Sequence, residues 1–315
     1  MSALEDILGD TSAARPRLTF LVHDIAGQDR GLYHGPVLQR LSQVDELVFN
    51  AWDTNWGKPL DAFAPLLEAL RRMVDLLVAA PGDPRITFVS SICAVGSWPL
   101  LHPEQPVIPE EVIWDCRSAM PHGYGESKCI AEQLLAKAHE ATKLRINILR
   151  VSQIGGPQYA KHWLWPRQGW LYSIIALSKR IGAFPEHVQA IDWIPVDALA
   201  HAISNCLKPS PGLDGLQVFN MVHPQPAAWS LFHEILRANF GIPAQTMDLP
   251  SWLDRIKDGD LRIQKFLRAQ GGGREMSLSF ANVRALKALP PISQMSAELL
   301  EAWLQGWKLG PVARL

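Results

Sequence analysis

HGYGESKCIAEQLL (122–135) places a tyrosine four residues before a lysine, at the predicted start of a helix. Residues four apart lie on one face of a helix, so Tyr124 and Lys128 should point the same way. The ammonium group of Lys128 would then favour the ionised phenol of Tyr124 and lower its pKa. A hydroxyl tuned in this way can protonate or stabilise an oxygen that gains charge during a reaction. The stretch therefore predicts an acid–base site.

Two predicted strands flank this helix. RITFVSSICAVG (85–96) is an apolar run with two serines near its end, and LRINILRVSQIGGP (144–157) is an apolar run that leads into a glycine turn. Successive residues of a strand point to opposite faces of the sheet, so one of Ser90 and Ser91 should face the site. We take Ser91 as the helper hydroxyl, although the sequence alone leaves the choice between the two serines open.

The same alternation of strands and helices extends along the chain. The apolar patterns predict further strands at 17–24 and 44–52, and helices at 35–43, 60–81, 127–143, 170–184, 195–208 and 297–308. Strands that alternate with helices of this length predict an α/β protein with a doubly wound parallel sheet covered on both faces. Beyond about residue 157 the pattern becomes less regular, which suggests a separate region.

Bulk composition excludes several classes of protein. The 315 residues carry a formal net charge of −1, so no basic surplus points to nucleic acid. The N-terminus lacks the basic start and apolar run of a signal peptide, and no stretch is long and apolar enough to predict a membrane span. The four cysteines show no metal-ligand spacing. These observations predict a cytoplasmic protein with reduced thiols and no metal site.

Several motifs occur in an order that resembles a known family. FVSSICAVG, HGYGESKCIAEQLL, RVSQIGGP and DWIPVDALA follow one another as in the extended short-chain dehydrogenase/reductases. VFNAWDTNWGKPLDAF and AMPHGYGESK are most similar to the thioester reductase domains that end fungal polyketide and nonribosomal peptide synthases. The resemblance covers most of the chain, from about residue 18 to about residue 308. One departure is Ser152, where the resemblance predicts glycine, and we read it as tolerated drift.

The resemblance implies an activity and a set of site residues. Such domains bind NADPH and reduce a carrier-tethered thioester to an aldehyde or alcohol. The implied catalytic residues are Tyr124 as proton donor, Lys128 as its partner and Ser91 as the third member. The implied cofactor-binding residues are Asp24, Asn50, Ala51 and Gln153, and the substrate-binding candidates are Trp52, His122, Ile154, Gly155, Trp165 and Trp170.

The family's usual phosphate cradle is missing from the expected place. Such chains open with a strand, a Gly-x-x-Gly-x-x-Gly turn and a helix, which together hold the pyrophosphate. Here Gly27, Gly31 and Gly35 are spaced by four residues and follow what matches the family's third strand. We therefore expect the given sequence to start about two strands late, either naturally or because the true start lies upstream. In that case no cofactor should bind tightly, and NADPH is the alternative.

The expected architecture follows from this comparison. Residues 1–205 should form a truncated Rossmann-like core without the first βαβ unit, with 157–190 contributing to the pocket. Residues 206–315 should form a smaller, mixed α/β substrate-binding region. The lost strands would expose a sheet edge, which favours a homodimer.

The sequence is consistent with three functions. The first is a tailoring or release enzyme of secondary metabolism that uses the Tyr/Lys/Ser site for a non-redox step. That step would be an aldol or Dieckmann-type cyclisation, a dehydration or a hydrolysis of a polyketide-like acyl or β-keto substrate, delivered by an acyl or peptidyl carrier protein. The alternative is NADPH-dependent reduction of a carrier-bound thioester. The third is a binding remnant without turnover.

Overall fold

The computed structural model describes residues 17–20, 24–25, 40–159, 165–208, 215–256, 263–264, 267–268, 278–307 and 309. The strands are β1 (Glu46–Phe49), β2 (Arg85–Ser91), β3 (Val107–Ile108), β4 (Arg145–Val151), β5 (Ile154–Gly155), β6 (Phe184–Pro185), β7 (Ile194–Pro195), β8 (Leu216–Met221), β9 (Thr246–Met247) and β10 (Ser279–Phe280). The α-helices are α3 (Ala64–Ala79), α4 (Trp98–Leu101), α5 (Gly123–Thr142), α6 (Gly169–Ile181), α7 (Val196–Cys206), α8 (Trp229–Phe240), α9 (Leu249–Asp254), α11 (Val283–Ala288) and α12 (Ala297–Gln305). Short 3-10 helices are η3 (Leu60–Phe63), η4 (Ile92–Ala94) and η5 (Cys116–Ser118).

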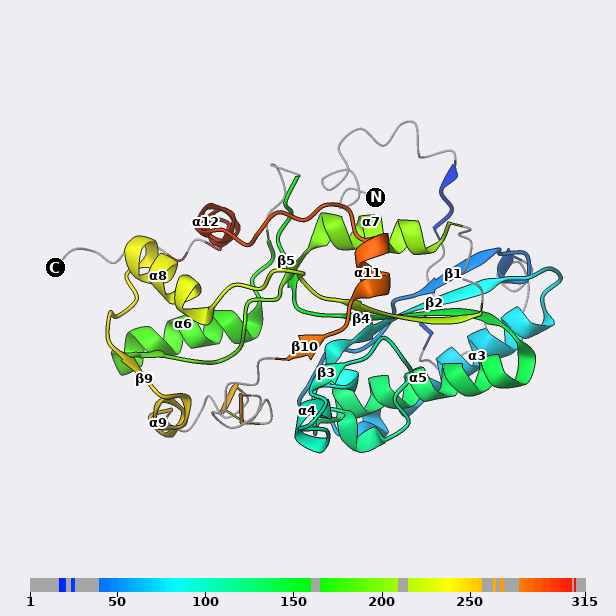
Figure 1. Ribbon diagram of the computed structural model, residues 1–315, viewed down its shortest axis with the longest axis horizontal. Coiled ribbons are helices and arrows are strands. Elements are labelled where there is room, and N and C mark those ends of the chain that lie inside the picture. Colours follow the sequence, from blue (N-terminus) through cyan, green and yellow to red (C-terminus); the bar gives the residue numbers. More distant parts are fainter. Residues whose placement is uncertain are drawn as a thin grey trace.

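A parallel sheet forms the centre of the larger part of the molecule. The described strands follow the order β1-β2-β4-β8, and every neighbouring pair is parallel. Helices α3 and α5 cover one face, and α7 and α11 cover the other (Figure 1). Because both faces are covered, β2 and β4 are buried along almost their whole length. The predicted α/β fold with a doubly wound parallel sheet is confirmed.

Alternating side chains of β4 pack into the hydrophobic cores on the two faces of the sheet. Ile146 and Ile148 face α3 and α5, whereas Leu149 and Val151 pack with α7 and α11 on the opposite face. This is the period of two that a strand imposes, and all four side chains are apolar because neither face meets water. Because β2, β4 and β8 run parallel to one another, their carboxyl ends meet at one edge of the sheet.

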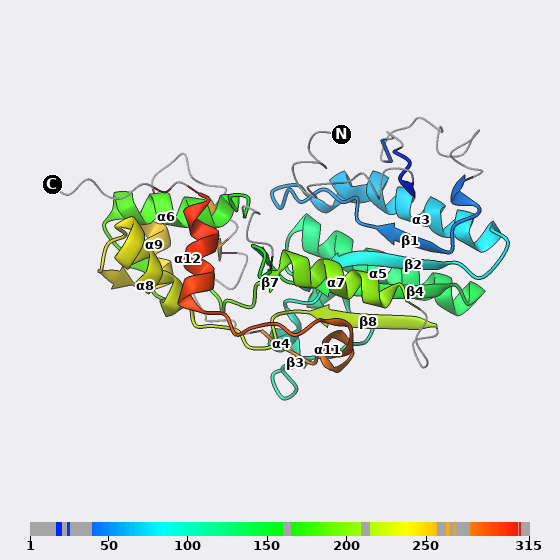
Figure 2. The same ribbon diagram turned by 90° about the horizontal axis from the view of Figure 1, so that it is seen from above.

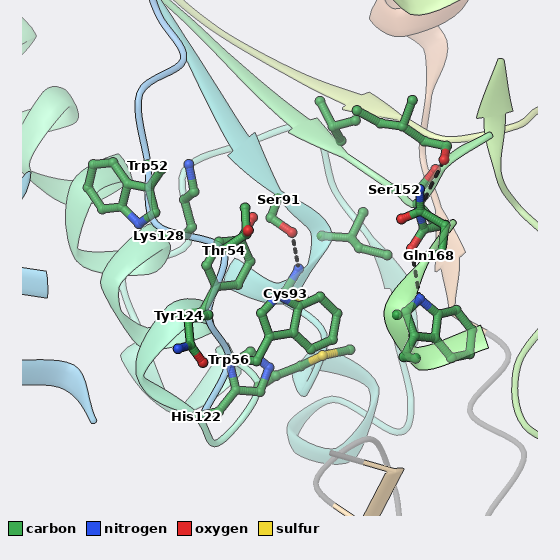
Figure 3. A pocket seen from close by; sticks show the side chains of 18 of the residues that line it. Trp52, Thr54, Trp56, Ser91, Cys93, His122, Tyr124, Lys128, Ser152 and Gln168 are labelled. Atoms are coloured by element: carbon green, nitrogen blue, oxygen red, sulfur yellow. Dashed lines mark hydrogen bonds between the residues drawn. The ribbon is translucent and has the colours of Figure 1, made fainter. Parts of the chain in front are cut away.

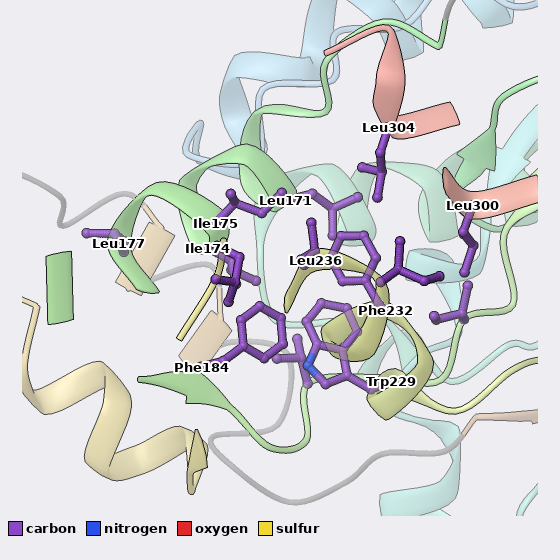
Figure 4. Packing of buried hydrophobic residues seen from close by; sticks show 14 of the residues in the cluster. Leu171, Ile174, Ile175, Leu177, Phe184, Trp229, Phe232, Leu236, Leu300 and Leu304 are labelled. Carbon is purple, nitrogen blue, oxygen red and sulfur yellow. The ribbon is translucent and has the colours of Figure 1, made fainter. Parts of the chain in front are cut away.

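A second, mainly helical part lies beside this edge (Figure 2). Helices α6, α8, α9 and α12 enclose a core rich in aromatic and branched side chains, including Phe184, Trp229 and Phe232 (Figure 4). The chain passes between the two parts more often than the expected boundary at 205 implies. Helix α6 precedes that boundary but belongs to the helical part, and β8 follows it but is the fourth described strand of the sheet.

The N-terminal expectations fall largely outside the described residues. Within the expected strand at 17–24, residues 18–20 and 24 have no strand conformation, and 21–23 are not described. Of the expected helix at 35–43, only 40–41 are described as helical. The first described strand of the sheet is thus β1, which matches the expected strand at 44–52.

A buried polar network fastens α5 to the sheet. Glu132 on α5 accepts hydrogen bonds from Nε and Nη2 of Arg150 on β4, at 3.0 and 2.7 Å to Oε2. Ser90 on β2 donates to the other oxygen of Glu132 at 2.5 Å. Arg150 is fully buried, and its remaining donors reach the carbonyls of Pro109 and Glu111. This pairing sets the position of α5, and hence of Tyr124 and Lys128, relative to the strand ends.

Candidate active site

The first turn of α5 is pressed against the surrounding backbone. His122 caps the helix, because its Nδ1 accepts a hydrogen bond from the amide of Gly125 at 3.0 Å. A Cβ on Gly123 would lie 2.5 Å from the carbonyl oxygen of Lys58, so only glycine allows this approach. The next residue, Tyr124, is thereby held at the edge where the strands end.

A cavity of about 1630 Å³ opens at this edge. Figure 3 shows Trp52, Tyr124 and Lys128 on one side, Ser91 and Cys93 in the middle, and Ser152 and Gln168 on the other side. The walls come from the loop after β1, the end of β2, the start of α5, the turn after β4, the start of α6 and the segment before β7. The sequence-predicted Tyr124, Lys128 and Ser91 are brought together in this cavity.

Aromatic rings enclose the phenol of Tyr124. Trp56 stacks on it with ring centroids 5.8 Å apart, and Phe63 meets it edge-on at 6.5 Å. Burial raises the pKa of Tyr124 above its ordinary range, the nearby Cys93 acts in the same direction, and a hydrogen bond with Ser91 opposes the change. The expected lowering of the Tyr124 pKa by Lys128 is therefore wrong for this structure. The physical reason is that burial desolvates the phenol, and the charge of Lys128 is not among the causes of the shift.

Lys128 is buried in an aromatic cage. Its Nζ lies 4.5 Å from the ring centroids of both Trp52 and Phe88, and 5.8 Å from that of Tyr124. The amine donates to the carbonyl oxygen of Val89 at 2.6 Å. Burial lowers the pKa of Lys128 to about 7, and the charges of Glu132 and Cys93 act in the opposite direction. The amine therefore loses its proton far more easily than a surface lysine.

The two serines of β2 point to different environments. Ser90 is tied to Glu132 on the side of α5, whereas Ser91 accepts a hydrogen bond from the amide of Cys93 at 3.2 Å and interacts with Tyr124. The structure thus gives Ser91 the position beside the phenol, and Ser90 a structural contact.

The other sequence candidates divide into two groups. Asn50, Trp52, His122, Gln153, Ile154, Gly155, Trp165 and Trp170 line the cavity, whereas Asp24 and Ala51 do not. Gln153 is fixed by its neighbours, since it donates to Gln168 at 3.1 Å and accepts from Trp170 Nε1 at 3.0 Å. Gly155 and Trp165 also serve packing, because both contact Trp303 of α12.

Three lining residues with chemically relevant side chains were not predicted from the sequence. Trp56 stacks on both His122 and Tyr124, and its signal was the strong match of VFNAWDTNWGKPLDAF to the resembled subfamily. Cys93 lies beneath Ser91, and burial raises the pKa of its thiol to about 11. Asp192 has the only carboxyl among the described lining residues. Asp192 opens the motif DWIPVDALA, but the motif gave no sign that its carboxyl belongs to a residue of the cavity wall.

The donors of the cavity suit the nicotinamide end of a dinucleotide. The hydroxyls of Tyr124 and Ser91 and the amine of Lys128 are the groups that bind ribose hydroxyls and a carbonyl oxygen. Nε2 of His122 is buried without a hydrogen-bond partner at the same wall, which leaves one more donor for a bound group. The fit concerns this end alone, because Gly27, Gly31 and Gly35 lie outside the described residues.

The fold and this cavity define a short-chain dehydrogenase/reductase-like domain. Residues 2–203 match the model of the NAD-binding family described as Male sterility protein, and the chain therefore belongs to that family. This confirms the resemblance drawn from the motifs.

Individual relatives extend the comparison. A carboxylic acid reductase of Neurospora crassa is 27% identical over 311 residues, covering 90% of this chain and 29% of the relative. An adenylate-forming reductase, Nps10, of Heterobasidion annosum is 31% identical over 243 residues, covering 76% of this chain and 21% of the relative. The terminal R domain from the myxalamid PKS-NRPS biosynthetic pathway shares the fold with a TM-score of 0.77 and 22% identity, covering 98% of this chain and 79% of that one.

The chain spans less than a third of the length of these two reductases. Within the described residues, no helix is both long and apolar enough to cross a membrane, and no cluster of His, Cys, Asp and Glu could hold a metal ion.

Proposed function

We propose that this chain is a reductive release domain, which uses NADPH to reduce a carrier-bound acyl thioester to an aldehyde or alcohol. The single observation that carries the proposal is the convergence of Tyr124, Ser91 and Lys128 in one cavity at the carboxyl ends of the parallel strands. Membership of an NAD-binding family supports reduction over the non-redox cyclisation that the sequence first favoured. A binding remnant is less consistent with a cavity whose walls carry three proton-handling side chains.

The surroundings of each residue suggest its role in the reaction. Tyr124 carries its proton near neutral pH, so it can donate to the carbonyl oxygen of the substrate, which becomes strongly basic once hydride has added to the carbon. Ser91, beside it, supplies a second hydrogen bond to the same oxygen. Lys128, together with His122 and Asn50 on the walls, would hold the ribose and nicotinamide. A reduced nicotinamide supplies the hydride when bound.

The substrate side of the cavity is bounded by aromatic and amide groups. Trp170 and Gln168 fix the amide of Gln153, and Val188 and Leu278 add apolar surface. This lining suits an acyl chain of polyketide or peptide origin, delivered on the phosphopantetheine arm of a carrier protein. A homodimer and a cytoplasmic location remain predictions.

The test measures NADPH binding and turnover by the full chain. Fluorescence titration should show binding in the micromolar range, and acyl thioesters should yield aldehyde or alcohol, by mass spectrometry, only when NADPH is present. Tyr124→Phe should lower the rate about 10²- to 10⁴-fold. A chain that binds NADPH no better than a mock protein, or that forms the same product without NADPH, would refute the proposal.

A further inference from the structure

We propose that Asp192 is a second acid of this site, which protonates the sulfur of the thiol that leaves when the thioester is reduced. The inference rests on the proposed function and deepens it. It concerns the one carboxyl among the described lining residues, a group that the Tyr124 chemistry does not use.

Reduction of a thioester requires protons at two different atoms. Hydride adds to the carbonyl carbon, and the π electron pair moves to the oxygen, which takes the proton of Tyr124. When the carbon–sulfur bond breaks, its electron pair stays with sulfur, the carbonyl reforms and the oxygen returns its proton to Tyr124. The sulfur then needs a proton of its own, and the balance is acyl thioester, NADPH and one proton to aldehyde, NADP⁺ and thiol.

Asp192 lies where a second proton source would be separate from the first. Its backbone carbonyl accepts hydrogen bonds from the hydroxyl of Ser152 at 2.8 Å and from the amide of His223 at 3.0 Å. Figure 3 shows Ser152 across the cavity from Tyr124 and Lys128. Asp192 is thus anchored to the ends of β4 and β8, opposite the phenol. Ser152, which looked like drift in the sequence, holds this anchor.

The carboxyl of Asp192 suits an acid in its protonated form. Burial raises its pKa to about 7, and only a hydrogen bond from its own backbone amide opposes this. Tyr124 and Lys128 line the same cavity from α5. The thiol of Cys93 on η4 senses the charges of both Lys128 and Asp192.

The other candidates for this role are engaged or unsuitable. Lys128 donates to the carbonyl of Val89 inside its aromatic cage. Nε2 of His122 has no hydrogen-bond partner, but its ring stacks on Trp56 and Tyr124 and so lies on the side of the first acid. The Cys93 thiol has a pKa of about 11, above the ordinary value of an alkyl thiol, so it is the weaker acid.

The experiment varies the leaving thiol while the acyl group stays the same. The full chain and its Asp192→Asn variant are given NADPH and matched acyl thioesters of N-acetylcysteamine and of 4-nitrothiophenol, over a panel of aliphatic and aromatic acyl groups. The alkyl thiol needs protonation to leave, whereas the acidic aryl thiol leaves as its anion. Asparagine keeps the backbone contacts that anchor the segment.

We expect Asp192→Asn to slow the alkyl thioester about 100-fold and the aryl thioester far less. Asp192→Glu should restore most of the alkyl rate, and Ser152→Gly should reproduce the asparagine pattern more weakly. Equal losses on both thioesters, or no loss on the alkyl one, would overturn the role of Asp192 alone. A wild-type chain that reduces neither thioester would instead overturn the proposed function, and this inference with it.

Discussion

Replacing Lys128 with methionine should stabilise the fold while it removes activity. Lys128 is 3% exposed, and burial lowers its pKa from the ordinary 10.5 to about 7. Each tenfold change in proton affinity corresponds to about 1.4 kcal/mol, so keeping the buried charge costs up to about 5 kcal/mol. Methionine has a similar length and no charge to desolvate.

Two contacts favour the charged form and keep this cost from being larger. A hydrogen bond from a charged group, here to the carbonyl of Val89, contributes about 1.5–3 kcal/mol. The rings of Trp52 and Phe88, each 4.5 Å from Nζ, contribute about 0.5–2 kcal/mol through cation–π attraction. The cost that remains is the one that the lowered pKa measures, so the gain expected for Lys128→Met below about pH 7 is up to about 5 kcal/mol in the free energy of unfolding.

The sign of the pH dependence follows from the lowered pKa. Below about pH 7, Lys128 is charged in both states and the native state bears the whole cost. Between about pH 7 and about pH 10.5 the unfolded chain binds a proton that the native chain lacks, so the wild-type protein gains stability as the pH rises. The advantage of Lys128→Met should thus be largest near pH 6 and nearly absent near pH 10.

Urea unfolding at both pH values measures the difference. Lys137→Met is the matched control on the same helix, because Lys137 is exposed and paired with Glu140, a contact worth at most about 1 kcal/mol. If Lys128→Met unfolds at lower urea than the wild type near pH 6, or if its advantage grows toward pH 10, the reasoning about the buried amine is refuted.

Two further substitutions test how the site is held. Glu132→Gln leaves the charge of Arg150 buried without its partner, so the free energy of unfolding should fall by about 3–5 kcal/mol in urea titrations. Asp75 forms an exposed ion pair with Arg71, so Asp75→Asn should lower the free energy of unfolding by less than about 1 kcal/mol. Equal losses for Glu132→Gln and Asp75→Asn would contradict the ranking by burial. Gly123→Ala forces a methyl group into backbone and should lower stability by about 1–3 kcal/mol in thermal melts. Gly169→Ala, with open space around it, should be nearly neutral, and similar losses for both would refute the steric argument.

Local patterns sufficed for the elements and for the central motif. The spacing of Tyr124 and Lys128 places both on one helix face whatever surrounds them, and the apolar runs at 85–91 and 145–151 predict buried strands because both faces lack polar positions. These features depend on residues close in sequence, so the sequence alone determined the parallel α/β class and predicted Tyr124 and Lys128 as an acid–base pair.

Long-range packing decided the properties of the site. Strand alternation places Ser90 and Ser91 on opposite faces of the sheet. Which of them faces the site is decided by Glu132 on α5, because Ser90 donates its hydroxyl hydrogen bond to that carboxylate. The pKa of Tyr124 rises rather than falls because Trp56 and Phe63 exclude water from it. Only the folded structure places Asp192 among the residues that line the cavity. Desolvation is the sum of everything packed around a group, and the residues that pack here come from distant parts of the sequence.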